Sequence, residues 1–209
     1  MALTLAPLLR DAGIDLADSL VIRHTYVRKH EDGVLGIHAD STDAEILQYT
    51  GHQSADTRRF PAVPPRFWVV FIREGGDQAR LWAVVENRGE ISNDGVRRFY
   101  DVVESDHMAD LCNRLVIGWR SPRRWWMRAS TAASYPVIGI ADAEPVPFPG
   151  FDRLVLEYAH LQAVMREHRY ASWRTALASV VGIYLITDTR DGRQYVGKAD
   201  GTESDGGSE

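Results

Sequence analysis

The sequence predicts an α+β fold: a curled antiparallel sheet or partial barrel with flanking helices, followed by part of a second, smaller β structure. Short runs of β-branched and aromatic residues recur through most of the chain, with turn residues about every ten positions, which is typical of a small curled sheet. Segments with helical signals flank these runs, and a proline-rich stretch at 142–150 separates them from a final pair of strands.

The first third of the chain alternates helical and extended segments. Residues 4–13 predict a short helix that ends at a glycine, and 20–28 predict a strand because β-branched and aromatic residues alternate with polar ones. A capping pattern predicts a helix over 43–52. Three prolines make 55–65 a loop.

The middle of the chain is rich in strand signals, which turn dipeptides such as Asp94-Gly95 separate. We expect one short helix among them, at 106–112. The predicted strands are 66–73, 80–87, 97–103, 114–119, 123–128 and 136–140.

The C-terminal third predicts two helices, one over 151–168 with an apolar stripe and a connector over 172–179. Strands are predicted at 181–187 and 194–199. The resulting domain organisation is an N-terminal α+β domain at 1–147, a helical connector at 148–179, a truncated hairpin at 180–199 and a disordered tail at 200–209.

Composition excludes several classes of protein. The chain has 209 residues, 44% of them apolar and 25% charged, and no run long enough to span a membrane. Its single cysteine, Cys112, excludes an internal disulfide and fits a cytoplasmic location. The net charge of −5 argues mildly against tight DNA binding by the chain as a whole, although a local basic patch can override it.

One such patch lies between residues 119 and 128. Four arginines alternate there with three tryptophans, a composition that can hold phosphates and stack on bases. In the alternative interpretation, the tryptophans fill a core and the arginines are solvated. The candidate nucleic-acid-binding residues are Arg120, Arg123, Arg124 and Arg128, with Arg58 and Arg59 of the proline-rich loop as weaker candidates.

Other titratable residues predict no site. His24, His30 and His38 match no metal-ligand spacing, so we expect structural or surface roles for them. Cys112 has an apolar helical setting without a neighbouring histidine and is expected to be a small buried side chain.

The last two predicted strands form a hairpin, because Asp191-Gly192 lies between them. A two- or four-residue loop would put Tyr184 and Tyr195 on the same face. With the four-residue loop 189–192, Tyr184 pairs with Gly197 and the tyrosines are diagonal neighbours, roughly 7 Å apart. With two loop residues they would be roughly 13 Å apart. The longer loop suits joint action on one phosphate better.

Gly182-Ile183-Tyr184, ten intervening residues and then Tyr195-Val196-Gly197-Lys198 resemble the signature of the GIY-YIG nucleases, here in the same strand–turn–strand context. The resemblance implies a partial GIY-YIG hairpin, DNA as the partner, and phosphodiester hydrolysis that requires Mg²⁺ or another divalent metal. It also implies that Tyr184 helps to activate the attacking water, while Tyr195 positions the water or the phosphate. Residues 1–175 are similar to the leading region of some bacterial proteins that end in such a module, on the segments 114–119 and 149–158.

The sequence departs from the family pattern after Lys198. The family places an arginine on the next helix and a metal-binding glutamate beyond it, whereas residues 199–209 contain no arginine and are rich in glycine. Neither Glu203 nor Glu209 is expected to bind the metal. We therefore expect the polypeptide as given to be truncated and inactive as a nuclease.

Three hypotheses remain open from the sequence. The chain is a GIY-YIG endonuclease that has lost its C-terminal half, a nucleic-acid-binding module with a vestigial nuclease hairpin, or an interaction protein with no nucleic-acid role.

Overall fold

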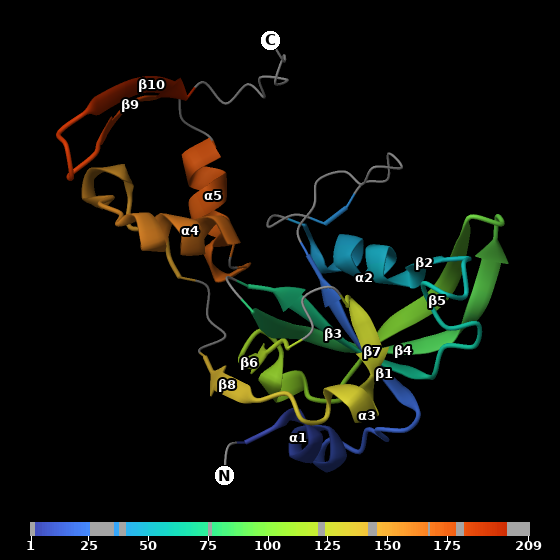
Figure 1. Ribbon diagram of the computed structural model, residues 1–209. Coiled ribbons are helices and arrows are strands. Elements are labelled where there is room, and N and C mark those ends of the chain that lie inside the picture. The colour runs from blue at the N-terminus through green and yellow to red at the C-terminus, as the bar shows by residue number, and fades with distance from the viewer. Residues whose placement is uncertain are drawn as a thin grey trace. The chain divides into compact units, whose positions relative to one another are not determined.

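The computed structural model describes residues 3–25, 36–37, 41–74, 77–120, 124–141, 146–166, 168–178 and 182–199 (Figure 1). The chain divides into two compact units, residues 1–144 and 145–209, and the division falls inside the proline-rich stretch. Unit 1 holds one large sheet with helices on both of its faces, and unit 2 holds short helices and a separate two-stranded sheet.

Unit 1 confirms the predicted α+β class with a strongly curled sheet. The eight-stranded sheet has the order β2-β5-β4-β3-β1-β7, with β6 between β4 and β8. Its strands are β1 (Ser19–His24), β2 (His52–Ser54), β3 (Phe67–Arg73), β4 (Gln78–Asn93), β5 (Arg97–Ser105), β6 (Leu115–Gly118), β7 (Trp126–Arg128) and β8 (Val137–Ile140). Of these, β2 was not predicted, and β4 extends well beyond the predicted 80–87 because it pairs with three neighbours in turn.

One pair of strands departs from the predicted antiparallel arrangement. Strand β1 pairs in parallel with β3, with Ser19 opposite Phe67 and His24 opposite Ile72. A parallel pair needs a long crossover connection, and α2 (Asp43–Gly51) lies in that connection. The predicted capping pattern is confirmed at the start of α2, where Thr42 and Glu45 form a reciprocal capping box.

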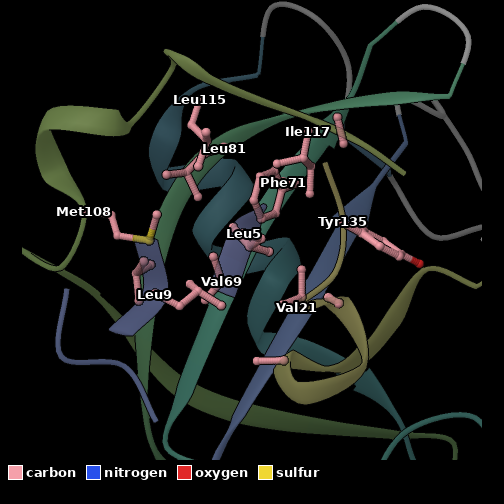
Figure 2. Close-up of a cluster of buried hydrophobic side chains, with 14 of the residues drawn as sticks. Leu5, Leu9, Val21, Val69, Phe71, Leu81, Met108, Leu115, Ile117 and Tyr135 are labelled. Atoms are coloured by element: carbon pink, nitrogen blue, oxygen red, sulfur yellow. The ribbon is translucent and has the colours of Figure 1, made fainter. Parts of the chain in front are cut away.

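The central strands are buried on both faces, so they read as continuous apolar runs. On one face Val21, Val69 and Phe71 pack with the helices α1 (Leu5–Asp11) and α3 (Ala129–Ala132), as Figure 2 shows for part of this cluster. In Figure 1 these two helices lie together on the side of the sheet away from α2. The sequence predicted α1 and gave no signal for the four-residue α3.

The second face carries the aromatic core. Ile22, Trp68 and Phe60 pack there with Ile46 of α2. A bulge in the pairing of β3 with β4 leaves Trp82 as an extra residue, so that Trp82 and its neighbour Ala83 both join this cluster. The predicted helix at 106–112 is a shorter 3₁₀ turn, η1 (Ala109–Leu111).

Unit 2 corrects the predicted helix at 151–168. The helix α4 (Tyr158–Arg166) begins only at Tyr158, and a 3₁₀ turn, η2 (Phe151–Arg153), precedes it. Between them Leu154 and Leu156 are half-buried and Val155 is 91% exposed, which is the alternation of an extended chain. These leucines pack against a small core around Trp173, whose indole donates to Val146 O at 2.9 Å.

The rest of unit 2 follows the sequence closely. The turn η3 (His168–Tyr170) leads into α5 (Ala171–Ala178), the predicted connector helix. Strands β9 (Gly182–Thr187) and β10 (Gln194–Ala199) then form the predicted antiparallel hairpin.

Candidate nucleic-acid interface

The hairpin has the register that a four-residue loop requires. Asp188 N donates to Arg193 O at 2.8 Å, which leaves residues 189–192 as the loop, and Gly192 takes a φ of +74° that favours glycine. Tyr184 is paired with Gly197, and Tyr195 with Ile186. Positions 184 and 195 are therefore diagonal neighbours on one face of the ribbon.

The other motif residues divide between the two faces. Ile183 is paired with Lys198 and Leu185 with Val196, so these positions share the face opposite Tyr195. Tyr195 is 61% exposed and Ile183 is 81% exposed. The side chain of Tyr184 lies outside the described part of the structure.

The described residues give no clustered set of side chains for a divalent metal ion. They contain no group of three or more His, Cys, Asp or Glu side chains that could hold one. Glu203 and Glu209 lie outside the described residues.

The Arg–Trp segment of unit 1 separates into a core part and a surface part. Trp119 is fully buried, packs edge-on against Tyr135 and donates from its indole to Arg124 O at 3.0 Å. The interpretation as core filler is therefore right for Trp119. Trp125 is 37% exposed, and Trp126 is only half-buried.

A cavity of about 640 Å³ opens at the surface part. It combines the segment 124–128 with the loop 55–65, which the sequence had linked only weakly to nucleic acid. We call it the Arg–Trp pocket. Its lining residues are Arg58, Arg59, Arg124, Trp125, Trp126, Met127, Arg128 and Thr131. Arg120 is exposed but does not line it, and Arg123 lies outside the described residues.

Local hydrogen bonds fix the arginine-bearing loop. Asp56 starts a tight turn, with Arg58 N donating to its carboxylate and Arg59 N to its backbone oxygen. The indole of Trp126 donates to Arg59 O at 2.6 Å, which ties the loop to β7. Phe60 then enters the aromatic core, where it is fully buried.

Arg98 of β5 also fixes this loop through hydrogen bonds, and the sequence analysis did not identify this residue. Its buried guanidinium donates to the backbone oxygens of Ser54, the last residue of β2, and of three loop residues, Phe60, Pro61 and Ala62. The alternation of side chains along a strand could have identified it, because Arg98 and the buried Tyr100 are two residues apart in β5 and so point to the same face of the sheet.

The pocket has an aromatic wall. Phe60 and Trp125 are stacked, with ring centroids 5.8 Å apart and planes 11° apart. Trp126 meets Trp125 edge-on at 6.5 Å. The Phe60 and Trp125 rings are therefore offset from one another, and Trp125 keeps over a third of its surface exposed.

The charge of the pocket is positive. Arg58 forms a paired hydrogen bond with Asp56, which lowers the pKa of that carboxyl. Arg59, Arg124 and Arg128 form no ion pair with a carboxylate among the described residues. No acidic residue lines the cavity within the described part of the chain.

Of the remaining candidates, the structure describes His24 and Cys112. His24 is buried and its ring contacts the Thr50 hydroxyl at 2.9 Å, while His30 and His38 lie outside the described residues. Cys112 is half-buried and not fully buried as expected. Burial raises the pKa of its thiol to about 11, which leaves it a poor nucleophile at neutral pH.

No family model matches the chain, and neither a curated protein nor a solved structure matches it. Within the described ranges, none of the helices combines the length and the apolar character that crossing a bilayer demands.

Proposed function

We propose that residues 182–199 form a hairpin of the GIY-YIG nuclease kind, in which Tyr184 and Tyr195 position a phosphodiester and the water that attacks it, although cleavage is not expected from these residues alone. The register of the hairpin carries the proposal. It sets position 184 beside Tyr195 on one face, through a four-residue loop, as joint action on one phosphate requires. Together with the tripeptides themselves, this geometry supports the family resemblance.

The proposal assigns only part of a catalytic site to the hairpin. In the family a glutamate binds the metal and an arginine binds the phosphate, and we expect both to come from outside residues 182–199. The competence of the hairpin can therefore be tested separately from the rest of the chain.

The test is a chimera in which residues 182–199 replace the matching hairpin of an active GIY-YIG nuclease. We expect the chimera to nick supercoiled plasmid in Mg²⁺. Tyr195→Phe removes one hydroxyl from the proposed site and should lower the rate about a hundredfold or more. Thr187→Val is the matched control, because it removes a hydroxyl from the opposite face of the same ribbon and should leave the rate unchanged. A folded chimera without activity, or equal rates for both variants, would contradict the proposal.

A second candidate function is nucleic-acid binding by unit 1 without cleavage. The observation that favours it is the convergence of four arginines from two distant segments on the Arg–Trp pocket. If a variant with an inactivated hairpin still binds nucleic acid, the result would support binding by unit 1 and would not support cleavage.

A further inference from the structure

We propose that the Arg–Trp pocket binds one unpaired nucleotide of a nucleic-acid strand, with its base stacked on Trp125 and its phosphates held by Arg59, Arg124 and Arg128. The inference deepens the binding function of unit 1 and does not depend on cleavage by the hairpin. It rests on the shape, the charge and the rigidity of the pocket.

The aromatic wall accounts for the base. The Trp125 ring runs nearly parallel to Phe60 in an offset arrangement, and its side chain is 37% exposed, so a planar base could stack on the exposed part of the indole. Stacking of a base on an aromatic side chain contributes about 1–3 kcal/mol and tolerates any sequence. In a duplex, both faces of each base are covered by neighbouring bases. Only an unpaired or extruded base can therefore use this wall.

The arginines account for the phosphates. Arg59, Arg124 and Arg128 line one cavity, and none of the three forms an ion pair with a carboxylate among the described residues. Guanidinium groups bind phosphate oxygens in pairs of parallel hydrogen bonds. The exposed hydroxyl of Thr131 on the same rim adds a neutral donor and acceptor for the sugar or the base edge.

The volume limits the ligand to a small unit. About 640 Å³ falls within the range of roughly 300–1,000 Å³ that is typical of small-molecule sites. A single nucleotide matches such a cavity, whereas a duplex needs an extended groove. The hydrogen bonds from Trp126 and Arg98 to the loop hold the walls before the ligand arrives, which reduces the entropy lost on binding.

The experiment measures binding of the full chain to labelled oligonucleotides by fluorescence anisotropy, in EDTA and at low salt, so that cleavage plays no part. Three probes of equal length are compared: a single-stranded oligothymidylate, its duplex, and an abasic strand with the same number of phosphates. We expect the base-bearing strand to bind about tenfold more tightly than the abasic strand. The duplex should bind no better than the abasic strand.

Two pairs of variants assign the effect to the pocket. Trp125→Leu should remove the preference for bases, and Trp125→Tyr should retain most of it because an aromatic face remains. Arg124→Gln should weaken binding of both strands. Arg88→Gln should not, although it removes the same charge, because Arg88 is an exposed residue of β4 outside the pocket. Circular dichroism spectra verify folding, and Arg128→Gln replaces Arg124→Gln if that variant does not fold.

Several results would overturn the inference. Equal affinity for the base-bearing and abasic strands would reduce the pocket to a plain basic patch. Duplex binding as tight as single-strand binding, or an Arg88→Gln loss equal to that of Arg124→Gln, would also contradict it. All of these affinities are measured without cleavage, so a failure of the nuclease proposal is distinguishable from a failure here.

Discussion

At the scale of single residues, Arg98 shows how a buried charge organises a surface site. Only 4% of the residue is exposed, and its guanidinium is satisfied by backbone oxygens of the loop that precedes β3. A buried charge is costly unless hydrogen bonds compensate it. Arg98 also lies over the ring of Phe60, which joins the loop to the aromatic core. We therefore regard it as a positioning residue for the Arg–Trp pocket.

Replacing Arg98 by methionine should destabilise unit 1. The change leaves several loop carbonyls without donors, each costing about 1–3 kcal/mol, so we expect the free energy of unfolding to fall by about 3 kcal/mol in urea titrations. Arg88→Met is the matched control, since the Arg88 side chain is over half exposed and its Nε lies 3.9 Å from Glu86 Oε2, a weak surface contact. Similar unfolding midpoints for the two variants would show that the loop does not depend on Arg98.

The sequence predicted which segment carries the candidate binding residues, but not which of its side chains lie in the core and which lie at the surface. Arg124 and Arg128 were expected at a nucleic-acid site and do line the pocket, while Trp119 belongs to the core although it lies in the same segment. Composition does not separate these cases. The burial of Trp119 depends on α1, α3 and β6 meeting on one face of the sheet, which no local pattern states.

At the scale of elements, the hairpin was predictable and the preceding helix was not. Asp191-Gly192 fixes a tight turn locally, and parity puts the two tyrosines on one face for a loop of either two or four residues. The structure has the four-residue loop, which suits joint action on one phosphate. The start of α4 is different, because Leu154 and Leu156 pack as an extended segment against Trp173 and its neighbours. Their spacing is compatible with both a helix and an extended chain, and tertiary contacts decide between them.

Engineered disulfides test the hairpin register directly. In a Cys112→Ser background, Leu185→Cys with Val196→Cys should form a disulfide in mild oxidant, because these residues are paired and the Cα atoms of cross-strand partners lie about 4.5–5.5 Å apart. The alternative register, in which the tyrosines are roughly 13 Å apart, would instead pair Leu185 with Lys198. Mass spectrometry of the second double variant, Leu185→Cys with Lys198→Cys, should therefore detect free thiols. The reverse pattern would exclude shared action of the tyrosines on one phosphate.

At the scale of the whole molecule, a small basic pocket belongs to a chain with a net charge of −5. The pocket forms because β7 and β3 both pair with β1, which brings the loop before β3 beside the segment 124–128. That parallel pairing joins segments far apart in sequence, so the convergence of Arg58 and Arg59 with Arg124 and Arg128 could not be predicted from local patterns.

The charge distribution predicts a modest salt dependence. Three unpaired guanidinium groups, at roughly 0.7 ions released for each phosphate contacted on a single strand, should give a slope of about −2 in a plot of log K against log salt concentration. Anisotropy titrations over a salt series measure this slope. A slope several units steeper would indicate a wide basic surface in place of a confined pocket.

Photocrosslinking tests most directly whether this chain engages nucleic acid through both the Arg–Trp pocket and the hairpin. A single strand with 5-iodouracil at defined positions is irradiated with the full chain, and the adducts are mapped by mass spectrometry. We expect adducts at Trp125 in unit 1 and at Tyr184 or Tyr195 in unit 2, with the first group lost in Arg124→Gln. Adducts confined to other surfaces, or none under conditions of measurable binding, would contradict the proposal.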